Sequence, residues 1–257
     1  MKIAVIGFGK MGSWMADELS KEHEIAVFDK DPEKTNRSVP YDILKKVEDV
    51  GDFKPDMLIN AVNIENTIEA FESVDGIVGS ECILCDMATI KKALPEYYER
   101  CNHKYASFHP MFGYAISNVG CLKDENAIII KESDETAKQF FRSLFDRLEI
   151  RTFEYSFKEH DEMMIHSLLL PFISSVVFAA CSPDKIVPGS TFSKYRAITL
   201  GLLNEDKTLL SEILFNNRSL EQVEKATGRF EFLKHIIKAR DYEEAATFFA
   251  KLRDNII

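Results

Sequence analysis

Lys2-Ile-Ala-Val-Ile-Gly-Phe-Gly-Lys-Met-Gly12 is the stretch that decides the fold of this chain. An apolar, β-prone run passes directly into the pattern Gly-x-Gly-x-x-Gly, and residues 13–19 then show helical spacing. In such a strand–turn–helix the first glycine permits a tight turn, the second lets a pyrophosphate approach the backbone, and the third lets helix and strand pack closely. The free N–H groups at the helix N-terminus attract phosphate. The stretch therefore predicts a dinucleotide site rather than a glycine-rich turn of a phosphate-free domain, with candidate residues Gly7, Phe8, Gly9, Lys10, Met11 and Gly12.

An acidic residue after the second β-prone run indicates which dinucleotide binds. Residues 24–28 form this run and Asp29 ends it. A carboxylate here accepts hydrogen bonds from both hydroxyls of the adenosine ribose and repels a 2′-phosphate. Lys30 follows, but no arginine stands beside it to hold a phosphate, so the sequence favours NAD over NADP. Ala61, at the end of another strand, is small enough for the cofactor to pass closely, and we add it to the cofactor-binding candidates.

Composition and charge narrow the function class. The chain has 257 residues, 46% hydrophobic and 29% charged, as in a soluble globular protein of one large or two ordinary domains. A net charge of −10 argues against a nucleic-acid partner, because a phosphate-backbone binder needs a basic face. We find no apolar run near the roughly 20 residues of a membrane span and expect no membrane association. The first strand begins at Lys2, so we expect no signal peptide.

The cysteines point to a reducing compartment. They are five, scattered and odd in number, and we therefore expect a cytoplasmic protein. Cys82 and Cys85 have a redox-like spacing but lie in an apolar run ahead of Asp86, which favours buried free thiols over a dithiol centre. No cluster has metal-ligand spacing, so no metal site is predicted. The five cysteines are Cys82, Cys85, Cys101, Cys121 and Cys181.

The order of elements predicts an α/β fold, an N-terminal Rossmann-type doubly wound sheet followed by an all-helical dimerisation domain. Up to about residue 155, short β-prone runs alternate with amphipathic helical stretches, which is typical of a parallel sheet. After it the pattern is helical and apolar on more than one face, as in helices buried in a bundle or against a partner subunit. We therefore expect a dinucleotide-binding domain at 1–155 and a helical substrate and dimerisation domain at 156–257, which makes a homodimer. The predicted strands are 2–6, 24–28, 57–60, 82–86, 105–108, 127–130 and 150–153. The predicted helical stretches are 10–22, 64–73, 91–100, 136–148, 158–181, 188–204, 207–216 and 220–252.

His109 is the best candidate for acid–base chemistry. Nicotinamide enzymes need a group that takes the hydroxyl proton as hydride leaves, and histidine suits this because its pKa lies near working pH. His109 follows the strand 105–108 and begins the loop His109-Pro-Met-Phe-Gly113. Ligands of open α/β sheets bind at the carboxyl ends of the strands. Taken alone, a loop histidine that bonds backbone would be the plainer interpretation.

Three motifs in order give the chain a resemblance to a known family. The string His109-Pro-Met-Phe-Gly113 is preceded by Asp86-Met-Ala-Thr-Ile-Lys91 and followed by Glu159-His-Asp161. Together they resemble the prephenate/arogenate dehydrogenase family of tyrosine biosynthesis, and the resemblance runs over nearly the whole length. It implies an NAD-dependent oxidoreductase that converts prephenate, or arogenate, by oxidative decarboxylation.

The resemblance also implies roles for single residues. His109 would bond the ring hydroxyl of prephenate and accept its proton. Thr89 would hold His109 or the substrate hydroxyl in place, although it also suits a helix N-cap ahead of Lys91, and Lys91 becomes a candidate for substrate binding. His160 would reach toward substrate or cofactor, although it could equally start a helix and face water.

The chain departs from the family pattern at several positions. Residues 168–172 are wholly apolar where relatives have polar positions, and Tyr114 stands where relatives often have proline. The arginine that holds the substrate carboxylate falls on Gly201 in our alignment. The basic residues one helical turn earlier are Arg196 and Lys194, and we take Arg196 as the carboxylate anchor with Lys194 second. Either could instead be a solvated helix charge, which leaves the choice between prephenate and arogenate open.

Two other functions fit the same predicted scaffold. A β-hydroxyacid dehydrogenase or imine reductase would place a catalytic lysine in the helical domain, where this chain has no obvious counterpart. A protein that senses NAD without turnover is the non-enzymatic alternative.

Overall fold

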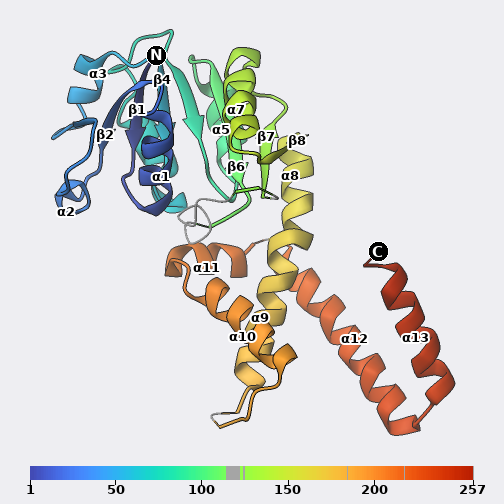
Figure 1. The fold of residues 1–257 in the computed structure, drawn as a ribbon. Helices are drawn as coiled ribbons and strands as arrows, with labels where there is room; N and C mark the ends of the chain where they lie inside the picture. The colour runs from blue at the N-terminus through green and yellow to red at the C-terminus, as the bar shows by residue number, and fades with distance from the viewer. Residues whose placement is uncertain (114–121, 124, 184, 217, 257) are drawn as a thin grey trace. The chain divides into compact units, whose positions relative to one another are not determined.

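The computed structural model describes residues 1–113, 122–123, 125–183, 185–216 and 218–256 (Figure 1). Within them the chain divides into two compact units, Met1–Met163 and Met164–Ile257. The first unit is built on an eight-stranded sheet of order β3-β2-β1-β4-β5-β6-β7-β8. Its strands are β1 (Lys2–Ile6), β2 (Glu24–Phe28), β3 (Asp42–Ile43), β4 (Met57–Asn60), β5 (Ile83–Asp86), β6 (Tyr105–Pro110), β7 (Asn126–Ile130) and β8 (Arg151–Tyr155).

The sheet is mostly parallel. Strands β1 to β6 pair in parallel, β7 runs antiparallel to β6, and β8 returns parallel to β7. The order reverses beside β1, where β2 and β4 flank it, and ligands of such sheets bind at that point. The carboxyl ends of β1, β4, β5 and β6 therefore share one edge of the sheet. The predicted fold class is confirmed, with β7 and β8 running opposite to the other six strands.

Alternate side chains along the strands pack into two hydrophobic cores, one on each face of the sheet. Along β1, Ile3 and Val5 enter one core while Ala4 and Ile6 enter the other, as the period of two in a strand requires. Helices α1 (Lys10–Leu19) and α7 (Glu135–Arg147) cover the first face. The other face is covered by α3 (Asp49–Phe53), α4 (Thr67–Glu72) and α5 (Leu94–Arg100). The unit also contains the short helices α2 (Pro32–Thr35) and η1 (Ile64–Asn66).

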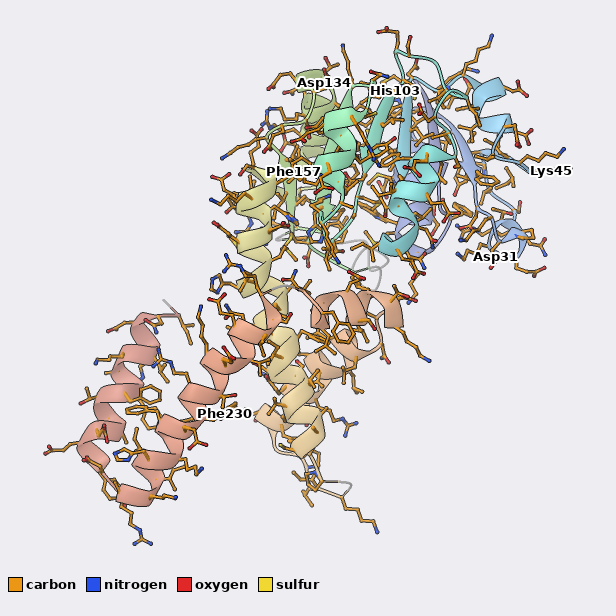
Figure 2. The ribbon with its side chains drawn as sticks, turned by 180° about the vertical axis from the view of Figure 1, so that it is seen from behind. Asp31, Lys45, His103, Asp134, Phe157 and Phe230 are labelled. Atoms are coloured by element: carbon orange, nitrogen blue, oxygen red, sulfur yellow. The ribbon has the colours of Figure 1, made fainter. Side chains whose placement is uncertain are left out.

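Two helix starts show how local sequence sets the elements. The carboxylate of Asp134, labelled in Figure 2, accepts from the backbone N of Thr136 at 2.9 Å and caps α7. Helix α5 begins at Leu94, three residues later than predicted, with Pro95 in its first turn, where proline is favoured. Its N-cap position is Ala93, so Thr89 does not cap it and that interpretation is wrong.

The last helix of the first unit is α8 (Phe157–Met164). Phe157, labelled in Figure 2, packs in the second core, and His160 one turn later is buried. The burial of Phe157 and His160 explains why the compact unit extends to Met163, beyond residue 155, where the sequence predicted its end.

Within the residues that the structure describes, the second unit consists of helices and their connections and has no strand. Phe178 of α9 packs against Phe192 and Tyr195 of α10, with ring centroids 5.2 and 4.7 Å apart. Phe232 of α12 and Phe248 of α13 lie 5.0 Å apart in the same way. The helices are the π-helical turn η2 (Ile165–Leu169), α9 (Leu170–Cys181), α10 (Ser190–Leu203), α11 (Lys207–Leu214), α12 (Ser219–Ala239) and α13 (Tyr242–Asp254).

Many large apolar side chains of the second unit are exposed. Phe230, labelled in Figure 2, is 55% exposed on α12. Ile198 and Leu200 of α10 are exposed as well, and so are Ile237 and Phe249 of the last two helices. We expected helices that are apolar on more than one face to be buried, and within one chain these side chains are not buried.

One stretch resembles a membrane span by composition. Phe157–Cys181 is a 25-residue helical stretch, long and apolar enough to cross a membrane by those two criteria alone. The expectation that no apolar run approaches such a length is wrong here. Length and composition are weak evidence by themselves, because the core helix of a soluble protein meets the same criteria.

Candidate active site

The glycine loop after β1 has the geometry expected of a phosphate cradle. Gly7 has φ of +89°, and a Cβ on it would lie 2.7 Å from the backbone of Ala61. A Cβ on Gly12 would lie 1.9 Å from the carbonyl oxygen of Gly7, so only glycine lets α1 approach the strand so closely. Gly9 instead faces open space and is the N-cap residue of α1, where no side chain caps the helix. The first-turn N–H groups of α1 are thus available to a phosphate.

Asp29 is held firmly at the end of β2. Its carboxylate accepts from the backbone N of Phe8 at 2.7 Å and from that of Asp31 at 2.9 Å, and its side chain is only 4% exposed. Nζ of Lys34 lies 3.4 Å from Oδ2 of Asp29. The bond from Phe8 ties the carboxylate to the glycine loop, so the acidic group and the phosphate cradle form one structure.

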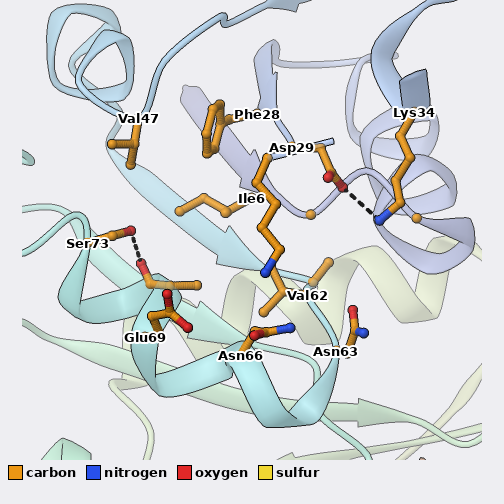
Figure 3. A pocket seen from close by; sticks show the side chains of 15 residues that line it. Ile6, Phe28, Asp29, Lys34, Val47, Val62, Asn63, Asn66, Glu69 and Ser73 are labelled. Carbon is orange, nitrogen blue, oxygen red and sulfur yellow. Dashed lines mark hydrogen bonds and ion pairs between the residues drawn. The ribbon is translucent and has the colours of Figure 1, made fainter. Parts of the chain in front are cut away.

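Figure 3 shows the pocket that these elements surround, a cavity of about 260 Å³. Gly7, Gly9, Asp29 and Ala61, all predicted as cofactor-binding, line it. The opposite wall of the pocket is one face of η1 and α4, and none of its residues was among the predicted site residues. Asn66, Glu69, Ala70 and Ser73 form this wall, and their helical spacing after a strand end was the signal available. Phe8, Lys10, Met11 and Gly12 are not among the lining residues, which also include Ile6, Phe28, Lys30, Lys34, Val47, Val62 and Asn63.

An arginine lies near the pocket that the sequence analysis did not consider. The guanidinium of Arg37 stacks over the Phe8 ring, 4.0 Å from its centroid. Arg37 stands eight residues after Asp29 in the chain, beyond the local pattern from which the cofactor was predicted. Arg37 thus places a positive charge beside the glycine loop, whereas the predicted NAD preference rests on Asp29.

His109 lies within a strand and not in the loop predicted for it. β6 continues to Pro110 because β7 pairs with its end, with His109 opposite Ile128. The side chain of His109 is buried, with the residue 5% exposed. It stands at the carboxyl edge of the sheet that also carries Gly7 and Ala61.

His160 contacts His109 directly. Nδ1 of His109 lies 3.2 Å from Nε2 of His160, and Nδ1 of His160 lies 3.3 Å from Oδ1 of Asp161. His160 is fully buried, so the alternative in which it faces water is wrong. The structure thus brings together two of the three predicted catalytic residues, and adds Asp161 from the same motif.

The three groups assign the protons of both imidazoles. The carboxylate of Asp161 can only accept, so Nδ1 of His160 carries a proton and its Nε2 accepts. Nδ1 of His109 must then donate to His160, which leaves Nε2 of His109 unprotonated. Burial lowers the pKa of His109 well below its usual value, and the charges of His160 and Lys91 lower it further. Burial also lowers the pKa of His160, which favours the neutral form of both rings.

Lys91 and Thr89 occupy different environments in the segment after β5. The Lys91 side chain is fully buried, and its ammonium donates to Asp86 at 2.6 Å and to the carbonyl oxygen of Phe108 at 2.8 Å. Burial lowers the pKa of Lys91, while the Asp86 carboxylate opposes that shift. Thr89 is half-buried in the irregular segment that precedes α5.

The remaining predicted residues belong elsewhere. Arg196 and Lys194 are exposed on α10 of the second unit, and their role as carboxylate anchors stays a prediction. Tyr114 and Cys121 lie outside the described residues. Cys82 and Cys85 are buried free thiols, as predicted, and burial raises the pKa of Cys82 to about 12. Among the described residues no group of three His, Cys, Asp or Glu side chains could hold a metal ion.

Comparison with known families decides which Rossmann-type protein this is. Residues 15–149 match the family model described as prephenate dehydrogenase, nucleotide-binding domain. The chain belongs to the prephenate dehydrogenase family. Residues 15–149, which include Asp29, match the nucleotide-binding domain of that family, and the resemblance inferred from the three motifs is confirmed.

Solved structures agree with this membership at the level of fold. Prephenate dehydrogenase from A. aeolicus, in complex with hydroxyphenyl propionate and NAD+, has a TM-score of 0.82 at 17% identity, covering 99% of this chain and 96% of that one. Synechocystis arogenate dehydrogenase has a TM-score of 0.76 at 16% identity, with both chains fully covered. An imine reductase from Bacillus cereus reaches 0.56 at 13% identity, over 99% of this chain and 93% of that one. No curated protein sequence matches the chain significantly.

Proposed function

We propose that this member of the prephenate dehydrogenase family is an NAD-dependent prephenate dehydrogenase that forms 4-hydroxyphenylpyruvate. The observation that supports it most is the buried, neutral His109–His160 pair at the sheet edge where the glycine loop lies. A dehydrogenase acting on a hydroxyl group needs such an acceptor beside its dinucleotide.

His109 would move one proton twice. Its unprotonated Nε2 accepts the proton of the ring hydroxyl while a hydride leaves the ring carbon that carries this hydroxyl. NAD, when bound, supplies the acceptor for that hydride. The ring carboxylate then departs as carbon dioxide, and its bond electrons complete the aromatic ring. His109 returns the proton to the ring oxygen, so the products are 4-hydroxyphenylpyruvate, carbon dioxide and reduced nicotinamide, with no net release of a proton. Aromatisation drives the reaction, and the protein mainly positions and polarises the substrate.

His160 and Asp161 would fix the tautomer of His109 on which this chemistry depends. Asp161 holds the proton of His160 on Nδ1, and His160 then accepts from His109. We keep Thr89 as a group that contacts the substrate hydroxyl or His109. Arg196, with Lys194 second, remains the proposed anchor of a substrate carboxylate, because a planar guanidinium suits a carboxylate.

The cofactor would be NAD. The pocket fits a dinucleotide, since Gly7 and Gly12 hold the loop close to the strand and the N-terminus of α1 is uncapped. The rigidly held Asp29 carboxylate suits two ribose hydroxyls and would repel a 2′-phosphate.

The active form would be a homodimer made through the helical unit. The exposed apolar side chains of α9, α10, α12 and α13 exceed what a helical unit alone in water normally shows. A dimer interface between copies of this unit would cover them. The free thiols, buried at Cys82 and Cys85, suit the cytoplasmic location proposed from the sequence.

Turnover with defined substrates tests the proposal. The purified chain is mixed with prephenate or arogenate, each with NAD or NADP, and reduced nicotinamide is followed by absorbance while the product is identified by mass. We expect turnover with prephenate and NAD, yielding 4-hydroxyphenylpyruvate. Preference for arogenate, with tyrosine as product, would instead make it an arogenate dehydrogenase, the activity named for the Synechocystis structure. Binding of NAD without turnover of either substrate would refute both activities and favour an NAD-sensing protein or another oxidoreductase on this scaffold.

A further inference from the structure

A buried ion pair lies directly behind the strand end that carries His109. Asp86, the last residue of β5, and Lys91 both have fully buried side chains, and their charged atoms are 2.6 Å apart. The Tyr98 hydroxyl of α5 donates to Oδ2 of Asp86 at 2.9 Å, and the backbone N of Ala88 donates at 3.0 Å to Oδ1, the oxygen that Lys91 also bonds. Burying a charge pair costs free energy unless further hydrogen bonds satisfy the charged groups, and here both Asp86 oxygens accept hydrogen bonds and the Lys91 ammonium donates two.

The ammonium of Lys91 also bonds the backbone next to His109. The pairing of β5 with β6 ends at Asp86 and Ser107, so the following residues of β6 have no neighbour in β5. Lys91 takes that place by donating to the carbonyl oxygen of Phe108 at 2.8 Å. This carbonyl belongs to the peptide bond that joins Phe108 to His109. The lysine therefore ties the position of the histidine to β5.

We propose that Lys91 is a positioning residue for His109 and not a substrate ligand: its ammonium fixes the strand end at Phe108 and places a buried positive charge beside the His109–His160 pair. This assignment rests on the proposed function of His109 and replaces the substrate-binding role that the sequence suggested for Lys91. A side chain with no exposed surface and two short hydrogen bonds within the protein is poorly placed to contact a substrate.

The charge has a definite effect on the histidine. Lys91 is one of the groups that lower the pKa of His109, after burial and His160. Among the described residues, Asp161 of α8 and Asp86 of β5 raise the pKa of His160, while Lys91 lowers it as well. A positive charge at this point disfavours the imidazolium and so keeps His109 ready to accept a proton.

Three variants separate charge from packing. Lys91→Met removes the charge at similar length, Lys91→Arg keeps it, and Tyr98→Phe removes a neighbouring hydrogen bond without changing any charge. In each, the titration of His109 is followed by NMR of its ring carbon, assigned with His109→Asn, and the pH profile of kcat/KM is recorded. We expect the His109 midpoint of Lys91→Met to move to higher pH and kcat to fall by about 10²-fold through misplacement of the ring. Tyr98→Phe should leave the midpoint unchanged, and Lys91→Arg should keep it closer to that of the wild type than Lys91→Met does.

A folded Lys91→Met protein with an unchanged His109 midpoint and normal kcat would overturn the proposal. If Lys91→Met does not fold, the double variant Lys91→Met/Asp86→Asn, which leaves no unpaired buried charge, provides the same comparison. The NMR titration needs no substrate. Failure of the proposed function, seen as no turnover by the wild type, is thus distinguishable from failure of this inference.

Discussion

Nδ1 of His109 in β6 lies 3.2 Å from Nε2 of His160 in α8, although 51 residues separate them in the chain. Both rings are buried, and Oδ1 of Asp161 lies 3.3 Å from Nδ1 of His160. The contact sets which nitrogen of His109 is free to accept a proton, and it explains why the two histidine motifs of this sequence belong to one site.

Replacing His109 should abolish most of the activity without affecting cofactor binding. His109→Asn removes the proton acceptor, and a general base contributes on the order of 10²–10⁴-fold to kcat. The Kd for NAD, measured by fluorescence titration, should stay as in the wild type. His235→Asn, at an exposed position of the second unit, is the matched control. Normal turnover of His109→Asn would show that another group takes the proton.

Asp161→Asn should reverse the tautomers with little change in shape. An amide can donate to Nδ1 of His160, which would place the His160 proton on Nε2 and force His109 to carry its own proton on the nitrogen that faces the substrate. We expect kcat to fall by about 10²-fold or more, as in other sites where a histidine is held in the wrong tautomer. Glu162→Gln, the next residue on α8, is the control. Should Asp161→Asn retain full kcat, the carboxylate does not set the tautomer.

The free energy of unfolding should fall as the solution is acidified below pH 6.5. Both histidines have folded-state pKa values below the ordinary 6.5, so in this range the unfolded chain binds protons that the folded chain does not. The loss approaches about 1.4 kcal/mol per pH unit for each such histidine. Urea denaturation at pH 7.5, 6.5 and 5.5 measures it, and His109→Asn should show a shallower dependence. Equal slopes for both proteins would mean that folding does not lower the pKa of His109.

Two glycines of the loop should respond differently to the same substitution. Gly12→Ala brings a Cβ to 1.9 Å from the Gly7 carbonyl oxygen, so it should destabilise the fold by about 1–3 kcal/mol. Gly9→Ala meets no atom within 4 Å and should fold normally. It should nevertheless weaken NAD binding, because its methyl group lies where the pyrophosphate approaches. Thermal melts and NAD titrations of the two proteins check this, and unchanged NAD affinity in Gly9→Ala would place the pyrophosphate elsewhere.

Arg196→Ala should raise KM for prephenate far more than it changes kcat. Loss of a charge-assisted, bidentate contact costs about 1.5–3 kcal/mol, which corresponds to roughly 10- to 150-fold in binding. Lys194→Ala, on the same helix, should have the smaller effect. If KM is unchanged in Arg196→Ala but raised in Lys194→Ala, the lysine is the anchor.

Several features of the site could be read from local sequence. Gly7, Gly12 and Asp29 were predictable because a strand, a glycine turn and a helix form a local unit with a fixed spacing. The alternation of strands and helices likewise predicted the mostly parallel sheet. The three motifs predicted the family for a similar reason, since each is a short string around one reacting or binding group.

Other features depended on contacts that no local pattern contains. His109 belongs to a strand because β7 pairs with it from the other side, and that pairing runs antiparallel. Thr89 resembled a helix cap, yet Lys91 turns into the core and the helix starts only at Leu94. Local propensity cannot anticipate this, because the ion pair with Asp86 and the bond to Phe108 form only once two strands and a helix have packed together.

By itself, then, the sequence determined the fold class, the dinucleotide loop and the family, since these rest on residues close together in the chain and on periodic burial. Only the tertiary structure decided the state of His109, the proposed catalytic histidine. His109 is buried, His160 and Asp161 bond in series behind it, and Lys91 is a buried cation paired with Asp86. The reason is that the protonation and orientation of His109 depend on burial and on charges a few ångströms away in space. These neighbours come from the segment between β5 and α5 and from α8, which only the fold brings next to β6.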